Sequence, residues 1–176
     1  MGLGDDIEIR RLGKSPLYEV WISRDGSKSN LKDVGVGVSQ VLPVIIAALH
    51  ASPGHIVMVE EPESHLHPLA QSILAELFAQ ESKERGVQFI AETHSEHLFR
   101  RMQTLLAKKE VNKTDCAMYF VENENGAAKF RPLEIDEFGR IHNWPDRFFG
   151  DSLGETKAQT DLMLQRLKEN RANNGS

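Results

Sequence analysis

The alternation of apolar and polar residues near the start of the chain predicts two short β-strands, at residues 7–12 and 17–23. Between them, Gly13 and Pro16 are residue types that turns favour. The two segments are close enough in sequence to pair across such a turn. We therefore expect an N-terminal β-hairpin.

The middle of the chain alternates short apolar runs with longer amphipathic stretches. The runs are typical of buried parallel strands and lie at residues 56–59, 87–91 and 116–121. Helices are predicted at residues 41–51, opened by a glycine-containing loop at 34–40, from Pro68 to the residue before Gly86, and after Ser95. This order predicts an α/β fold, with a parallel sheet flanked by helices and right-handed crossovers.

The last third of the chain departs from this alternation. Asn125-Gly126 is a hairpin-turn pair and joins residues 118–121 to 129–133 as an antiparallel edge. Residues 141–150 gather Trp144, Phe148 and Phe149 into a loop, and residues 155–170 predict a polar helix. The aromatic side chains suit either a structural anchor, which we favour, or stacking on nucleic-acid bases.

Composition narrows the class of protein. A length of 176 residues suits one domain with a small appendage, and 40% hydrophobic residues suffice for a core. The net charge of -5 gives no global basic field for nucleic acid, although Arg100-Arg101 and Lys108-Lys109 allow a local basic surface. A single cysteine, Cys116, excludes an internal disulfide framework. Since no apolar run approaches the ~20 residues of a membrane span, we expect a soluble, cytoplasmic protein.

Acidic residues follow the first predicted parallel strand, and a histidine follows the second. Glu60, Glu61 and Glu63 come directly after residues 56–59, and His94 comes shortly after 87–91. The carboxyl ends of parallel strands share one sheet edge, where open α/β proteins bind ligands. A carboxylate there can hold hydrated Mg²⁺, a second can orient water, and histidine can contact a phosphoryl oxygen. The alternative is an acidic loop that favours the N-terminus of the next helix, with Thr93 or Ser95 as a simple N-cap.

In combination, the order of these elements resembles the ABC-type P-loop ATPases, closest to the overcoming-lysogenization-defect and Rad50-like branch of predicted bacterial AAA ATPases. Residues 36–40 match the signature loop, 56–61 match Walker B, 64–67 match the D-loop, and His94 matches the switch histidine. The sequence segments at residues 33–43 and 60–68 resemble those of one bacterial subgroup, in which an extension of unassigned function follows the ATPase core. The resemblance implies parts at 1–33 (hairpin), 34–121 (ATPase half-core) and 122–176 (C-terminal extension).

The resemblance implies a role for each matched residue. Glu60 would hold Mg²⁺ through water and Glu61 would be the catalytic base, while His94 would contact the γ-phosphate of ATP. The signature residues Gly37, Ser39 and Gln40 would serve the nucleotide of a second head, and the D-loop would contribute Ser64 and His65 to binding.

Three departures from the family pattern matter. Glu60 replaces the usual aspartate, and Gly37 replaces the signature serine, for which Ser39 is a substitute. No complete Gly-x-x-x-x-Gly-Lys-Ser/Thr phosphate loop occurs, and Gly13-Lys14-Ser15 is better explained as a hairpin turn with a solvated lysine. The chain is therefore expected to be the carboxyl-terminal half of an ATPase head.

Such a half would hydrolyse ATP only when a phosphate-loop lobe is supplied, from the same gene upstream or from a separate subunit. The implied partners are a second head in a homodimer, a nuclease or other effector, and DNA, in genome defence or DNA maintenance, with no membrane. Two alternatives stay open: an inactive ATPase-derived module that docks an effector, and a metal-dependent hydrolase that uses His65, His67, His94 and His97.

Overall fold

The computed structural model describes residues 4–145 and 162–163. These residues divide into two compact units, one with the residues up to Met118 and Glu134–His142, the other with Tyr119–Leu133 and the residues from Asn143 onward. The predicted terminal helix at 155–170 lies outside the described residues, apart from the helical Leu162 and Met163, and so do Phe148 and Phe149. No helix among the described residues has the length and apolar character to cross a membrane.

The predicted N-terminal hairpin is confirmed. Strands β1 (Asp6–Arg11) and β2 (Tyr18–Arg24) pair antiparallel, and β3 (Ser27–Asn30) adds a third strand. Gly13 has a φ of 56° in the connecting turn, where Ser15 N donates to Leu12 O. Gly13-Lys14-Ser15 lies in the turn between two antiparallel strands. A phosphate loop instead connects a strand to a helix, so this triplet is not a phosphate loop.

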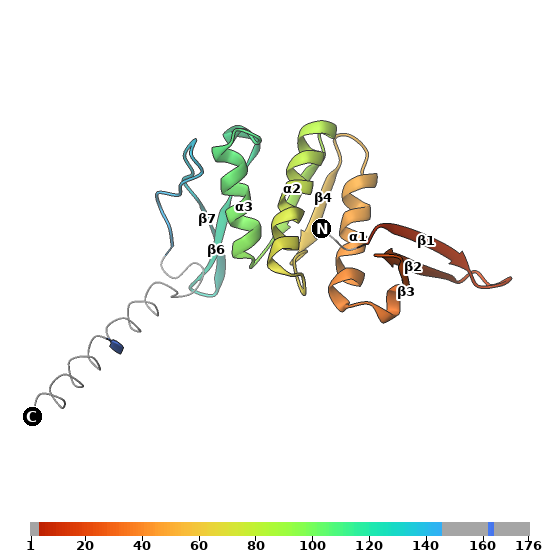
Figure 1. Ribbon diagram of the computed structural model, residues 1–176. Coiled ribbons are helices and arrows are strands. Elements are labelled where there is room, and N and C mark those ends of the chain that lie inside the picture. Colours follow the sequence, from red (N-terminus) through yellow and green to blue (C-terminus); the bar gives the residue numbers. More distant parts are fainter. Residues whose placement is uncertain (1–3, 146–161, 164–176) are drawn as a thin grey trace, which may run out of the picture. The chain divides into compact units, whose positions relative to one another are not determined.

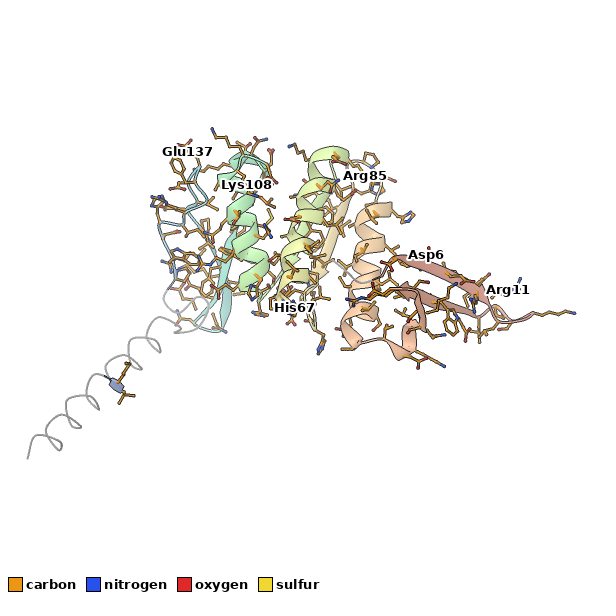
Figure 2. All side chains as sticks on the ribbon, in the orientation of Figure 1. Asp6, Arg11, His67, Arg85, Lys108 and Glu137 are labelled. Atoms are coloured by element: carbon orange, nitrogen blue, oxygen red, sulfur yellow. The ribbon has the colours of Figure 1, made fainter. Side chains whose placement is uncertain are left out.

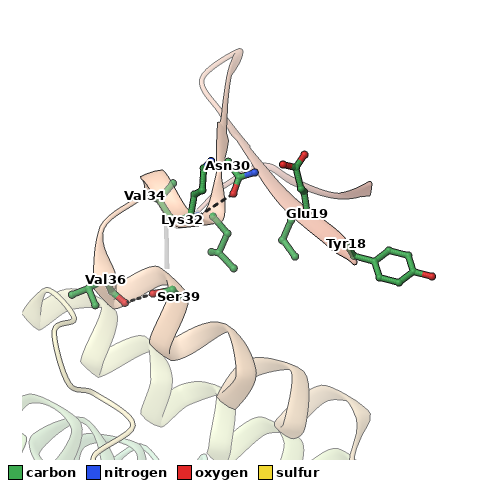
Figure 3. Close-up of a pocket in the computed structure, with 9 residues that line it drawn as sticks. Tyr18, Glu19, Asn30, Lys32, Val34, Val36 and Ser39 are labelled. Atoms are coloured by element: carbon green, nitrogen blue, oxygen red, sulfur yellow. Dashed lines mark hydrogen bonds between the residues drawn. The ribbon is translucent and has the colours of Figure 1, made fainter. Parts of the chain in front are cut away.

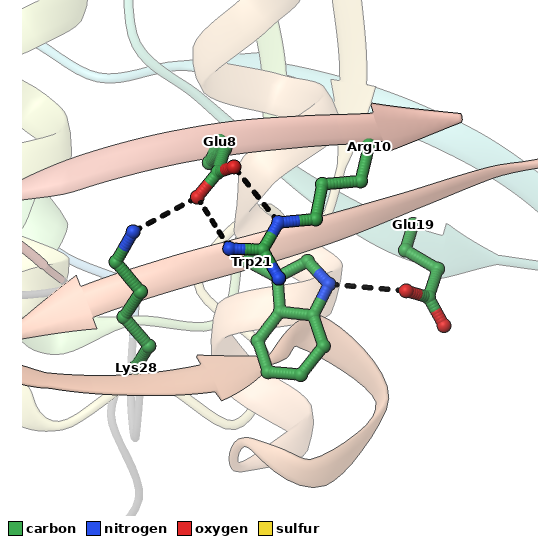
Figure 4. Close-up of polar contacts among 5 residues, drawn as sticks. All are labelled: Glu8, Arg10, Glu19, Trp21 and Lys28. Carbon is green, nitrogen blue, oxygen red and sulfur yellow. Dashed lines mark hydrogen bonds and ion pairs between the residues drawn. The ribbon is translucent and has the colours of Figure 1, made fainter. Parts of the chain in front are cut away.

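One face of this sheet carries a charged cluster (Figure 4). Arg10 and Lys28 both donate to the carboxylate of Glu8, and the Arg10 guanidinium lies 5.0 Å from the centre of the Trp21 ring. The two hydrogen bonds from Arg10, and then the one from Lys28, lower the pKa of Glu8 to about 2. The cluster is exposed, so it orders the sheet surface and adds little to stability.

The parallel part of the fold has two strands, β4 (Ile56–Glu60) and β5 (Gln88–Glu92), paired in register from Ile56–Gln88 to Glu60–Glu92. Three helices, α1 (Val36–His50), α2 (Pro68–Arg85) and α3 (Glu96–Ala107), lie side by side in Figure 1. Their apolar side chains form one core with Val59 and Phe89 of the sheet, and Phe89 stacks on Phe78 with ring centres 4.5 Å apart.

The opposite face of the β4–β5 sheet is uncovered among the described residues. Ile56, Met58 and Ile90 alternate with the core residues along the strands, and Met58 is 74% exposed. Parallel sheets in α/β proteins are normally covered on both faces. The sheet therefore presents an apolar surface that none of the described residues covers.

The second unit contains the predicted antiparallel hairpin, which is also confirmed. Strands β6 (Tyr119–Glu124) and β7 (Ala127–Pro132) pair around Asn125 and Gly126, both with positive φ, as the turn preferred by hairpins requires. The prediction that residues 116–121 continue the parallel sheet is wrong, because β6 pairs only with β7 among the described strands. Local pairing across the tight turn replaces the long-range pairing with β5.

Helix α1 begins earlier than predicted. The expected loop at residues 34–40 ends at Gly35, and Gly37, Ser39 and Gln40 lie inside the first two turns of the helix. Gly37 is buried, and a Cβ atom placed on it would lie 2.4 Å from the carbonyl oxygen of His65. Close packing against that backbone outweighs the weak helix propensity of glycine, so the helix extends through it.

Candidate functional site

The carboxyl edge of the β4–β5 sheet carries two adjacent glutamates. Glu60 is the last residue of β4 and pairs with Glu92 in the register of the sheet. Glu61 has a φ of 43°, in the left-handed region that non-glycine residues rarely adopt, and its N–H donates to the carbonyl oxygen of Glu92 at 2.8 Å. This backbone turn ends the strand and presents the Glu61 side chain at the sheet edge.

Glu61 lies beside two other residues that the sequence predicts for the site. The hydroxyl of Ser64 donates to Glu61 Oε2 at 3.0 Å, and His94 Nε2 lies 3.8 Å from Glu61 Oε1. The carboxylate is 55% exposed and the imidazole 78% exposed, so both are open to solvent. An accessible carboxylate that a hydroxyl orients is suited to hold and deprotonate a water molecule. Glu61, Ser64 and His94 thus form one cluster.

Two polar residues to which the sequence assigns no separate role, Glu63 and Gln71, join the loops on either side of this cluster. Glu63 is 6% exposed, and its Oε1 accepts the backbone N–H of His94 at 2.8 Å. Gln71 donates to the carbonyl oxygen of Leu66 and accepts from the hydroxyl of Ser95. The only sign of Gln71 in the sequence is its place on the apolar face of α2, in line with Leu74.

The predicted signature residues lie apart from the Glu61 cluster but contact the same loop. Gly37 packs on the backbone of His65, which has a φ of 62°. Ser39 donates its hydroxyl to the carbonyl oxygen of Val36, and Gln40 is exposed on the surface of α1. The loop at residues 61–67 therefore contacts the predicted signature on one side and carries the predicted base on the other.

A shallow groove of about 550 Å³ opens at the start of α1 (Figure 3). It lies between β2, the turn after β3 and the first turn of α1. Its lining residues are Tyr18, Glu19, Val20, Asn30, Leu31, Lys32, Val34, Val36 and Ser39. The predicted signature thus borders a concave surface that contains one basic side chain.

The donor set at the sheet edge fits a magnesium ion better than a transition metal. Glu60 and Glu61 offer adjacent exposed carboxylates, and Mg²⁺ prefers a few carboxylate oxygens together with water and phosphate. Among the described residues, no three histidine, cysteine or acidic side chains come together as a metal site. His67 instead caps α2, where its Nδ1 accepts from Leu69 N at 3.3 Å.

Comparisons with known proteins agree with these observations. A family model described as AAA ATPase domain matches residues 4–99, and a model of a family of unknown function, DUF3696, matches residues 111–159. No curated protein matches the chain. One similar solved structure comes from work on the ATP-driven dimerization and DNA stimulated activation of SMC ATPases. It is 16% identical with a TM-score of 0.53, over 76% of this chain and 77% of that chain, which shows the fold.

Proposed function

The chain belongs to the AAA ATPase domain family through residues 4–99, and from this membership we propose that it is the carboxyl-terminal half of an ATP-hydrolysing head. The observation that carries the proposal is the Glu61 cluster, in which Ser64 holds one carboxylate oxygen and the His94 ring lies beside the other. The fold of an SMC-type ATPase and the predicted Rad50-like family support the same function.

In this proposal the residues at the sheet edge have separate tasks. Glu61 orients the attacking water and takes its proton, while His94 donates a hydrogen bond to the γ-phosphate. Glu60 would hold Mg²⁺ through water, and the ion would supply positive charge against the phosphate oxygens. Ser64 keeps the Glu61 carboxylate in place, as the 3.0 Å hydrogen bond indicates.

The phosphate-binding loop comes from another lobe, since the sequence contains no complete phosphate loop. The uncovered apolar face of β4–β5, with Ile56, Met58 and Ile90, supports this part of the proposal, because a parallel sheet needs a second covering layer. Two heads then form a homodimer in which Ser39 and Gln40 of the predicted signature, next to the buried Gly37, and the D-loop residue His65 face the opposite nucleotide. Stimulation by DNA, as in the SMC ATPase work, and a role in genome defence or DNA maintenance belong to the same proposal.

The test is ATP turnover by the purified chain and by an assembly that includes a phosphate-loop lobe encoded upstream or in the adjacent reading frame. The chain alone is expected to show no appreciable turnover. In the assembly, Glu61→Gln should slow turnover about 100-fold or more while ATP-dependent association in sedimentation is kept. Glu84→Gln, an exposed glutamate of α2, is the matched control and should leave the rate unchanged. An unchanged rate in Glu61→Gln would show that Glu61 is not the base.

The alternative of an effector-docking module has one observation in its favour. The β6–β7 hairpin exposes Tyr119, Val121 and Phe130 on one face, with the Tyr119 and Phe130 rings edge to face at 6.3 Å. If an assembly with the phosphate-loop lobe binds ATP but never hydrolyses it, docking is the better function. If Phe130→Ser then fails to capture the effector but still binds ATP, the exposed face of the β6–β7 hairpin is the docking surface.

A further inference from the structure

Glu63 differs from the other acids of the loop after β4 because its carboxylate is buried. Glu60 and Glu61 are exposed, whereas Glu63 is 6% exposed. Its Oε1 accepts from His94 N at 2.8 Å, and its Oε2 has no hydrogen-bond partner among the described residues. Burying a carboxylate with one oxygen unpaired costs free energy, so a residue of this kind calls for an explanation in function or specificity.

The backbone around Glu63 links it to Glu61. Ser64 N donates to the carbonyl oxygen of Glu61, and Leu66 N donates to that of Glu63, so consecutive tight turns hold the loop. His94 contacts this loop at two points. Its backbone N–H is bonded to the Glu63 carboxylate, and its ring lies 3.8 Å from the Glu61 carboxylate.

The first turn of α3 is held by hydrogen bonds that do not involve Glu63. Ser95, the residue after His94, caps the helix by accepting from Leu98 N and donates to Gln71 of α2. Loss of the Glu63 carboxylate would thus release the His94 backbone without uncapping α3. This separates a role in placing His94 from a role in holding the helix.

We propose that Glu63 is a positioning residue, whose buried carboxylate fixes the His94 backbone so that the imidazole stays beside Glu61. The consequence for catalysis rests on the proposed ATPase function, whereas the link itself is a property of this chain. A hydrogen bond from a backbone N–H to a carboxylate is stronger than one to a neutral acceptor, which suits a contact that must hold a loop in one place.

The link is tested in the full chain by nuclear magnetic resonance of the His94 backbone amide. Glu63→Met keeps the length and apolar stem of the side chain but has no carboxylate, and the His94 amide should exchange with solvent about tenfold faster or more. Glu63→Gln keeps an acceptor oxygen, so protection should stay close to that of the wild type while the amide proton resonance moves upfield. Glu81→Gln, the matched buried glutamate of α2, should change neither quantity.

Two results would overturn the link. One is equal protection of the His94 amide in Glu63→Met and the wild type. The other is an unmoved amide proton resonance in Glu63→Gln, which decides the question even if Glu63→Met does not fold.

The catalytic consequence is measured separately, in the assembly with the phosphate-loop lobe. Glu63→Met should lower kcat about tenfold with KM for ATP unchanged, and Glu63→Gln should recover most of the rate, because misplacing one contact in the site slows catalysis without weakening binding. Equal kcat in Glu63→Met and the wild type would overturn the positioning role. An inactive wild-type assembly would instead refute the proposed function, and the His94 amide would still report whether the link exists.

Discussion

The two ends of α2 each have a buried glutamate nearby, and the surroundings of the two carboxylates differ. His67 and Arg85 mark these ends in Figure 2. Near the C-terminal end, Glu81 accepts from Arg85 at 2.8 Å. Near the N-terminal end, Glu63 accepts one backbone N–H and keeps one oxygen without a partner among the described residues.

The backbone shows the same contrast. At the C-terminal end, Arg85 donates to the carbonyl oxygens of Ala48 and Leu49 in the last turn of α1 and of Ala51, the residue that follows the helix. Gly86 takes the left-handed conformation that glycine allows. At the N-terminal end, non-glycine residues Glu61 and His65 have positive φ. One end satisfies its polar groups, and the other retains strain and an unpaired oxygen where the candidate site lies.

The largest expected effect tests the C-terminal end of α2, where the polar groups have hydrogen-bond partners. Arg85→Ala would leave the Glu81 carboxylate buried without its cation and would free the α1 carbonyl groups, so unfolding free energy should fall by about 3 kcal/mol. Urea denaturation followed by circular dichroism measures it. Lys108→Ala removes a cation from an exposed pair with Glu110 and should cost about 0.5 kcal/mol or less. Equal losses in the two variants would contradict the special role of the Arg85 contacts.

The second prediction compares a glycine near each end of α2. Gly37 of α1 packs on His65 near the N-terminal end, and Gly86 follows the C-terminal end. Gly37→Ala would place a Cβ atom 2.4 Å from the His65 carbonyl oxygen, and this overpacking should cost about 2 kcal/mol even though alanine favours helix. Gly86→Ala would place a Cβ atom at an ordinary contact distance of 4.0 Å from Gly54 N, but the φ of 67° strains alanine, so it should cost about 1 kcal/mol. Urea denaturation ranks the two.

The ranking has a clear alternative. If Gly86→Ala is the more destabilising of the two, the loop at residues 61–67 moves to accommodate the new methyl group, and the contact between Gly37 and the His65 backbone adds little to stability. Close packing at Gly37 would then no longer distinguish the N-terminal end of α2 from its C-terminal end.

Local patterns were enough to predict much of the fold. The parallel strands at 56–59 and 87–91, the helix from Pro68 to Gly86 and the cap at Ser95 follow from apolar runs and capping residues near in sequence. The placement of Glu61 near His94 also follows, because parallel strands end at one sheet edge.

Contacts between distant residues account for what could not be predicted. Arg85 reaches carbonyl groups more than thirty residues away, and Glu63 meets the backbone of His94 across a similar separation. Packing on His65 likewise pulls Gly37 into α1, against its own propensity. None of these pairings leaves a periodic pattern, so the sequence alone cannot distinguish Glu63 from the exposed acids beside it.

The smallest expected effect tests the strain at the site. Glu61→Gly would relieve the positive φ, and this gain of about 1 kcal/mol should offset the greater flexibility of glycine in the unfolded chain, for a net change within about 0.5 kcal/mol. Glu60→Gly, one residue earlier in the extended strand β4, has no strain to relieve and should cost about 1 kcal/mol. Urea denaturation measures the unfolding free energy of both variants, and Glu61→Ala, which loses the same Ser64 hydrogen bond but keeps a Cβ atom, separates the loss of that contact from the backbone term. Equal destabilisation would mean that the conformation of Glu61 is not costly, and the contrast between the two ends of α2 would then rest on the unpaired Glu63 oxygen.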